Sequence, residues 1–188
     1  MLGYHDRYPP TFFVRCDMSD YDDIMKPLMA GDIALLSEFS EIVDDFPTGK
    51  DHFIGRHWIT NAIDCGTAAV VEWMLEMGAP VVFHDDEGYS VLHAAIEREK
   101  PDRVKIASML IAAGADVNAH GTYDFTPAHF AAVHNDVDIL KLLVAAGADL
   151  TIQTRIDNYA TPLQEIEYRG DSPDAMAYLR IASQSTGR

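Results

Sequence analysis

The chain has 188 residues, of which 48% are hydrophobic and 10% aromatic, so it is long and apolar enough to fold as one domain with a sizeable core. Its 30 acidic residues outnumber 14 basic ones, and the resulting net charge of −16 repels phosphate backbones and anionic lipid. These values argue against nucleic acid and membranes as partners and favour a protein with a basic surface, although the same charge also serves solubility alone.

The cysteines and the N-terminal residues indicate a cytoplasmic location. Cys16 and Cys65 are far apart and lack a partner at metal-ligand spacing, so we expect neither a disulfide framework nor a zinc site. Residues 1–16 lack the pattern of a signal peptide. The apolar stretch at residues 104–115 is interrupted by Lys105 and Ser108 and is too short to cross a bilayer.

In chain order, the predicted elements begin after an N-terminal arm at residues 1–20, whose role the sequence leaves open. Residues 21–50 form a divergent first unit, in which Ala30-Gly31-Asp32 precedes apolar residues at helical spacing. Residues 51–83 form a second unit, whose last helix ends at Gly78-Ala79. We expect each unit to contain two short helices that pack on the next unit.

The central units, residues 84–119 and 120–153, carry the clearest pattern. Leu-Ile-Ala-Ala-Gly-Ala-Asp, ending at Asp116, returns as Leu-Val-Ala-Ala-Gly-Ala-Asp, ending at Asp149, 33 residues later. Self-similarity at such a period is typical of stacked helical repeats. A hydroxyl residue is expected to cap the first helix, and a glycine in the left-handed conformation is expected to end the second. Pro101 and its charged neighbours at residues 98–103 mark a loop between two helices.

A fifth unit, residues 154–188, repeats the helix start with Thr161-Pro162 and then loses the pattern. The central units resemble the ankyrin repeat through Gly88-Tyr89-Ser90-Val91-Leu92-His93, through Thr126-Pro127 with His129, and through their Gly-Ala-Asp ends. The resemblance implies an all-α repeat: an ankyrin solenoid of about five helix-turn-helix units at residues 21–188, with β-turn hairpins between units and degenerate terminal units. It also implies that His93 and His129 hydrogen-bond the backbone of a neighbouring unit.

No group of residues indicates catalysis, a cofactor or a metal ion. His52, His57 and Cys65 fall close together, and His84 precedes Asp85 and Asp86, but neither set supplies four matched ligands at a known spacing. Phosphate-binding glycine loops are absent from the sequence. We predict a protein that is not an enzyme, and an enzyme that uses the His52, His57 and Cys65 group remains an alternative.

The resemblance implies that a partner protein binds the hairpin tips and the exposed ends of the first helices, which line a concave surface. Hairpin aromatics are expected to face solvent, where contact with a partner would explain them; the alternative is that they pack against adjacent hairpins. The predicted contact residues are Phe53, Arg56, Asp64, Asp86, Glu87, Tyr89, Glu97, Tyr123, Phe125, His134, Asp157, Asn158 and Tyr168.

A small, acidic, single-domain chain of this kind is similar to bacterial ankyrin proteins, some of which are immunity proteins that neutralise a cognate toxin. That similarity implies inhibition by occlusion of the toxin's active site or substrate groove. The carboxylates of Asp64, Asp86, Glu87 and Asp157 would pair with basic residues, as they would on a toxin whose groove binds nucleic acid. The alternatives are a regulatory scaffold and an effector that binds host proteins.

Overall fold

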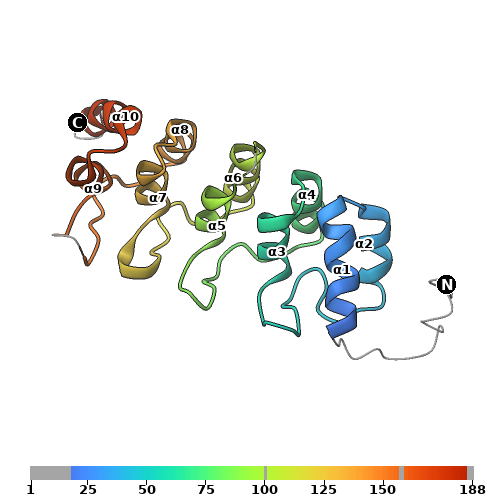
Figure 1. Cartoon of the computed structure of the whole chain (residues 1–188). Coiled ribbons are helices and arrows are strands. Elements are labelled where there is room, and N and C mark those ends of the chain that lie inside the picture. Colours follow the sequence, from blue (N-terminus) through green and yellow to red (C-terminus); the bar gives the residue numbers. More distant parts are fainter. Residues whose placement is uncertain (1–17, 100, 157–158, 186–188) are drawn as a thin grey trace.

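The computed structural model describes residues 18–99, 101–156 and 159–185, and within them the chain forms α-helices joined by loops. The helices pair in chain order and stack along one axis (Figure 1), which confirms the predicted all-α repeat. Their bounds are α1 (Met18–Ala30), α2 (Ile33–Ser40), α3 (Trp58–Cys65), α4 (Ala68–Glu76), α5 (Val91–Glu97), α6 (Arg103–Ala112), α7 (Pro127–Val133), α8 (Val137–Ala145), α9 (Pro162–Arg169) and α10 (Pro173–Ser185). Most of the predicted arm, residues 1–17, lies outside the described residues.

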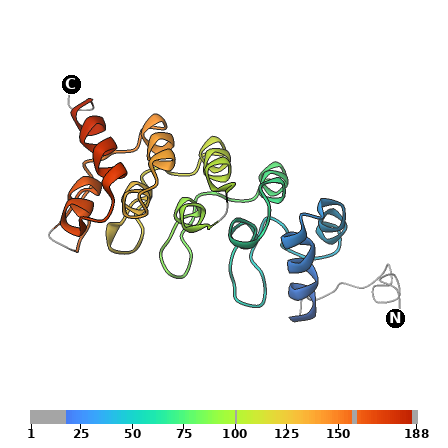
Figure 2. The same cartoon turned by 45° about the horizontal axis from the view of Figure 1, so that its top comes forward.

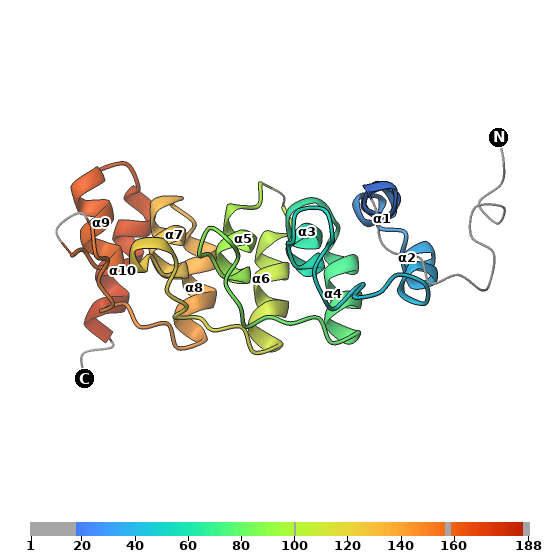
Figure 3. The ribbon, with the colours of Figure 1, turned by 90° about the horizontal axis from the view of Figure 1, so that it is seen from below.

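The helices form two rows, which Figures 2 and 3 show from different sides. The first helix of each pair, α1, α3, α5, α7 and α9, belongs to the inner row, and the second helix belongs to the outer row. The loops between successive pairs extend from the inner row as hairpins (Figure 1). The core lies between the rows, where side chains such as Leu92, Leu110 and Leu143 are fully buried.

The helix ends follow from local sequence, as predicted. Ser90, Thr126 and Thr161 each form a capping box, in which side chain and backbone at the helix start satisfy each other's hydrogen-bonding groups. At the other end, Gly114 and Gly147 adopt φ of 96° and 92°, a left-handed conformation that residues with a Cβ atom adopt only with strain.

The loop at residues 98–102 contains a buried strut that the sequence did not reveal. Arg98 is only 5% exposed, and its guanidinium donates to the carbonyl oxygens of Ile63 and Gly66 in the preceding unit. Asp102 accepts from the same guanidinium at 2.9 and 3.0 Å, and its pKa is lowered, chiefly by this hydrogen bond. Arg98 and Asp102 of the predicted loop therefore fasten the third unit to the second.

The last unit keeps its helices although its sequence loses the repeat pattern. Helix α10 continues to Ser185, and Arg180 donates to Glu167 of α9 at 2.9 Å across the end of the stack. Glu167 occupies the position that buried Ala132 holds in α7, so this end of the described stack carries charge where internal units carry apolar surface. Within the described residues, no helix is long and apolar enough to span a membrane.

Candidate functional site

Backbone hydrogen bonds close the hairpins and fix where their tips project. Gly121 N–H donates to the carbonyl oxygen of Phe125 at 2.7 Å, and Thr154 N–H donates to that of Ala160 at 3.0 Å. The same type of bond joins Asp85 to Tyr89 at 2.9 Å. We use the name hairpin face for the hairpin tips together with the adjoining surface of the inner row.

His93 of α5 and His129 of α7 each bond the hairpin of the following unit, which confirms the predicted structural role. Nδ1 of His129 accepts from the N–H and hydroxyl of Thr126 at 3.2 and 2.8 Å, and its Nε2–H donates to the carbonyl oxygen of Ala160 at 3.1 Å. His93 makes the same contacts with Ser90 and Phe125. Burial lowers the pKa of each imidazole to about 4, so both rings are neutral near pH 7.

Two aspartates organise hairpin tips, a role that was not predicted from the sequence. Asp51 is buried, and one of its carboxylate oxygens accepts from the N–H groups of Phe53, Ile54 and Gly55 at 3.1, 2.7 and 3.2 Å. Asp85 accepts from Glu87 N–H and Tyr89 N–H at 3.0 and 2.8 Å. An aspartate that precedes a turn by a few residues, as Asp51 precedes Gly55, can accept from the N–H groups of that turn, and this spacing could have predicted the role.

The expectation that four hairpin aromatics face solvent is correct for Phe53 and Tyr123, which are 50% and 57% exposed. It is wrong for Tyr89 and Phe125, which are half-buried. Both pack against Phe130 of α7, with ring centroids 5.3 and 5.9 Å away in edge-on geometry. Phe130 was not among the predicted contact residues, because its motif position is held by Ala94 in α5 and gave no sign of function.

The charged residues on the hairpin face divide into paired and exposed groups. Arg56 pairs with Asp64 at 2.7 Å, so this carboxylate has a cation within the chain, and its contact with a partner stays a prediction. Asp86, Glu87 and Glu97 are exposed. Although Glu97 is exposed, neighbouring residues partly desolvate its carboxylate and raise its pKa; His134 acts in the opposite direction, and the carboxylates of Asp64, Glu87 and Asp85 raise the pKa further.

The remaining predicted contact residues lie toward the C-terminal half of the stack. His134 is exposed, and its Nδ1–H donates to the carbonyl oxygen of Phe130 at 2.9 Å. Tyr168 is exposed on α9. Asp157 and Asn158 lie outside the described residues. Tyr159, the next residue in the sequence, was not among the predicted contact residues and is 63% exposed.

The tip that carries Tyr123 is held by the following hairpin. Tyr123 and Asp124 both have positive φ, 59° and 63°, within the short turn η2 (Thr122–Asp124). Arg155 pairs with the Asp124 carboxylate, and its backbone N–H donates to the carbonyl oxygen of Tyr123 at 2.9 Å. A strained tyrosine is therefore fixed in an exposed position instead of relaxing into the fold.

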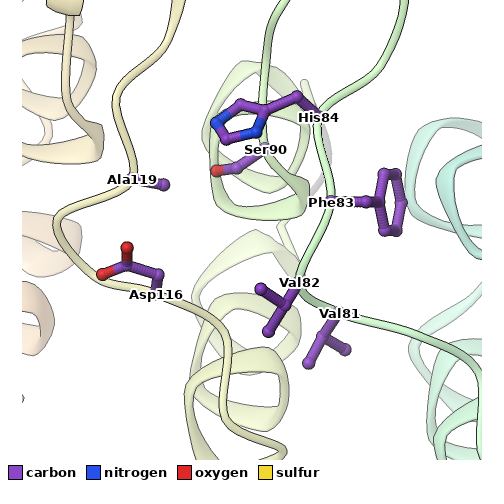
Figure 4. A pocket seen from close by; sticks show the side chains of 7 residues that line it. All are labelled: Val81, Val82, Phe83, His84, Ser90, Asp116 and Ala119. Atoms are coloured by element: carbon purple, nitrogen blue, oxygen red, sulfur yellow. The ribbon is translucent and has the colours of Figure 1, made fainter.

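The two residue groups that were weighed as metal ligands, His52 with His57 and Cys65 and His84 with Asp85 and Asp86, do not form a ligand set among the described residues. Within the described ranges, no group of three His, Cys, Asp or Glu side chains is placed to hold a metal ion. His57 instead packs on Phe83, with ring centroids 4.0 Å apart, and burial lowers its pKa. A pocket of about 130 Å³ lies between the hairpin that precedes α5 and the hairpin that precedes α7 (Figure 4), lined by residues that include Val82, His84 and Asp116.

Comparison with known proteins identifies the repeats. A family model described as "Ankyrin repeats (3 copies)" matches residues 57–154. The RelA-associated inhibitor of Mus musculus is 38% identical over 104 residues, which are 55% of this chain and 12% of that protein. The ankyrin repeat protein FPV244 of Fowlpox virus is 41% identical over 76 residues, 40% of this chain and 11% of that protein.

A third relative, the BCL-6 corepressor-like protein 1 of Homo sapiens, is 33% identical over 101 residues, 53% of this chain. The match covers 6% of that protein, so this chain corresponds to a small part of each of the three relatives. These relatives come from animals and a virus, and the expected bacterial type finds no support among them.

Proposed function

Because the chain belongs to the ankyrin repeat family, we propose that it is a non-catalytic module that binds another protein through the hairpin face. The observation that carries this function is Tyr123, whose ring is 57% exposed on a backbone with φ of 59°. A left-handed residue with a Cβ atom costs about 1 kcal/mol, and a ring left in water returns little of that energy. Burial of the ring against a partner would return it, as tyrosines commonly do at interfaces.

The partner has a basic surface. Asp86, Glu87 and Glu97 are exposed on the hairpin face, and the net charge of −16 accelerates encounter with a cationic protein. The exposed rings of Phe53 and Tyr123 would fill apolar pockets between the partner's basic residues. We therefore expect added salt to slow association of the complex. Loss of the aromatic side chains should instead speed its dissociation.

Within this role, we propose inhibition by occlusion of the partner's active site or substrate groove. An immunity protein that neutralises a cognate toxin is the form that the acidic charge favours when the toxin has a basic groove for nucleic acid. A regulatory module is the second candidate, because two relatives are named an inhibitor and a corepressor-like protein. The two candidates share the hairpin face and differ in the partner.

Affinity purification of the tagged chain, in low and high salt, tests the function. We expect a basic protein at near-stoichiometric amounts, and we expect the Phe53→Ala/Tyr123→Ala double variant to lose it. Ile181→Ala is the matched control, because Ile181 is exposed on α10 in the outer row. Equal recovery by both variants would exclude the hairpin face as the binding surface. Loss of the partner's enzymatic activity in the complex would support inhibition, and a partner of unchanged activity would contradict it.

A further inference from the structure

Aromatic side chains gather around Phe130 of α7 in an aromatic wall, which we define as Tyr89, Phe125, Phe130 and His134. The Phe130 ring is central: it lies 5.3 Å from Tyr89, 5.9 Å from Phe125 and 6.1 Å from His134, between ring centroids. Phe130 is half-buried, so part of its ring remains at the surface. Neighbouring α5, which contacts α7, carries the small side chain of Ala94 at the position that Phe130 holds in α7.

Glu97 stands beside the aromatic wall in an environment that disfavours its charge. It is the last residue of α5, where the negative end of the helix dipole opposes a carboxylate. Asp64, Glu87 and Asp85 add negative charge around it, while His134 of the wall is the neighbour that favours the ionised form. Arg56 is already paired with Asp64 at 2.7 Å.

Given the protein-binding role proposed above, we infer that Glu97 and the aromatic wall hold one arginine side chain of the partner. The guanidinium donates to the Glu97 carboxylate, and its planar face lies against the Phe130 or Tyr89 ring. Arginine fits better than lysine because its delocalised, weakly hydrated cation stacks on aromatic rings while its edge donates to a carboxylate. Charge complementarity selects this occupant over an acidic or neutral segment.

The test is a titration of the full chain, followed by NMR, with a glycine–serine peptide that contains arginine. Peptides with lysine or citrulline in place of arginine are titrated in parallel, because citrulline keeps the shape and removes the charge. We expect shifts at Glu97 and Phe130, weaker binding of the lysine peptide and none of the citrulline peptide. Glu97→Gln and Phe130→Leu should each weaken arginine binding by about fivefold or more.

The matched control is Glu76→Gln, because Glu76 is likewise exposed and is the last residue of its helix, α4, in the outer row. It removes the same charge from a distant position, so we expect less than about a twofold change. Equal weakening by Glu97→Gln and Glu76→Gln, with shifts still on the hairpin face, would overturn the arginine site and leave the proposed function standing. Shifts confined to α4, α6 and α8 would contradict both.

Far-UV circular dichroism and thermal unfolding verify that each variant is folded before titration. Should Phe130→Leu fail to fold, Glu97→Gln decides the outcome alone, because an exposed carboxylate at a helix end contributes little to stability. Unchanged arginine binding by folded Glu97→Gln would refute the site.

Discussion

Replacement of His129 by glutamine should remove part of the pH dependence of folding. His129 accepts from Thr126 and donates to Ala160, and burial lowers its pKa from 6.5 to about 4. The fifth unit supplies the replacement, because Gln164 at the same motif position accepts from Thr161 N–H at 3.0 Å. Glutamine can thus keep the capping box while it removes the titrating group.

The sign and size of the change in stability with pH follow from the pKa values of His129 in the unfolded and the folded chain. The unfolded chain binds a proton below about pH 6.5, whereas the folded chain resists protonation of His129 until about pH 4. The stability that the neutral ring contributes is complete above pH 6.5 and is lost as the pH falls toward 4. Between pH 7.5 and pH 5 this loss amounts to about 2 kcal/mol for one histidine.

Urea unfolding of both proteins at pH 7.5 and pH 5, followed by circular dichroism, measures the effect. The free energy of unfolding of His129→Gln should fall by about 2 kcal/mol less than that of the natural chain over this range. His93 titrates in both proteins, and relief of acidic self-repulsion at lower pH is also common to both, so these contributions cancel in the comparison. Equal losses of stability in the two proteins would refute the assigned burial and neutrality of His129.

Three substitutions test other parts of the structure. Val82 is 73% exposed and occupies the position that Asn118 holds in the next unit, where the Asn118 side-chain oxygen accepts from Asp149 N–H at 2.8 Å. Val82→Asn should therefore raise the free energy of unfolding by about 1 kcal/mol in urea titrations. A lower free energy of unfolding would contradict this alignment of the hairpins. Arg98→Met should lower it by about 3 kcal/mol in the same assay, because the buried guanidinium contacts are lost; a change below about 1 kcal/mol would show that the strut is dispensable. Tyr159 has φ of 57°, a left-handed conformation that asparagine tolerates better than tyrosine. Tyr159→Asn should therefore stabilise the fold by up to about 1 kcal/mol in thermal unfolding, and it should weaken capture of the partner. An unchanged stability would show that the backbone at Tyr159 is relaxed.

The parts of the fold that depend on local sequence could be predicted. Thr126-Pro127 starts a helix, and the glycine of Gly-Ala-Asp ends one, because each acts on hydrogen bonds within a few residues of itself. Repetition of these signals 33 residues apart then fixes the stacking, since each unit has the same apolar faces. The helix pairs follow from these two signals without any long-range information.

The parts that depend on contacts between units could not be predicted. Arginine side chains are usually exposed, so the sequence gives no reason to expect Arg98 to be buried. Its burial depends on two carbonyl oxygens of the preceding unit, which accept from its guanidinium. Tyr89 and Phe125 were expected in solvent because nothing in the sequence places Phe130 between them. Predicted contact residues with short-range structural roles, such as Arg56 and Asp64, were for the same reason indistinguishable from residues that await a partner.

Charge on the hairpin face is distributed unevenly along the stack, because the inner-row helices end in residues of opposite charge. Helix α5 ends at Glu97, a charge that its dipole disfavours, whereas α9 carries Arg169 in its last turn, a charge that its dipole favours. The basic partner proposed above would therefore gain more at α5 than at α9, while the exposed ring of Tyr123 lies between the two helices in chain order. Because α5 stands in the middle of the inner row and α9 at its C-terminal end, this difference would favour one orientation of the proposed partner over the reverse, which aromatic contacts alone would leave undetermined.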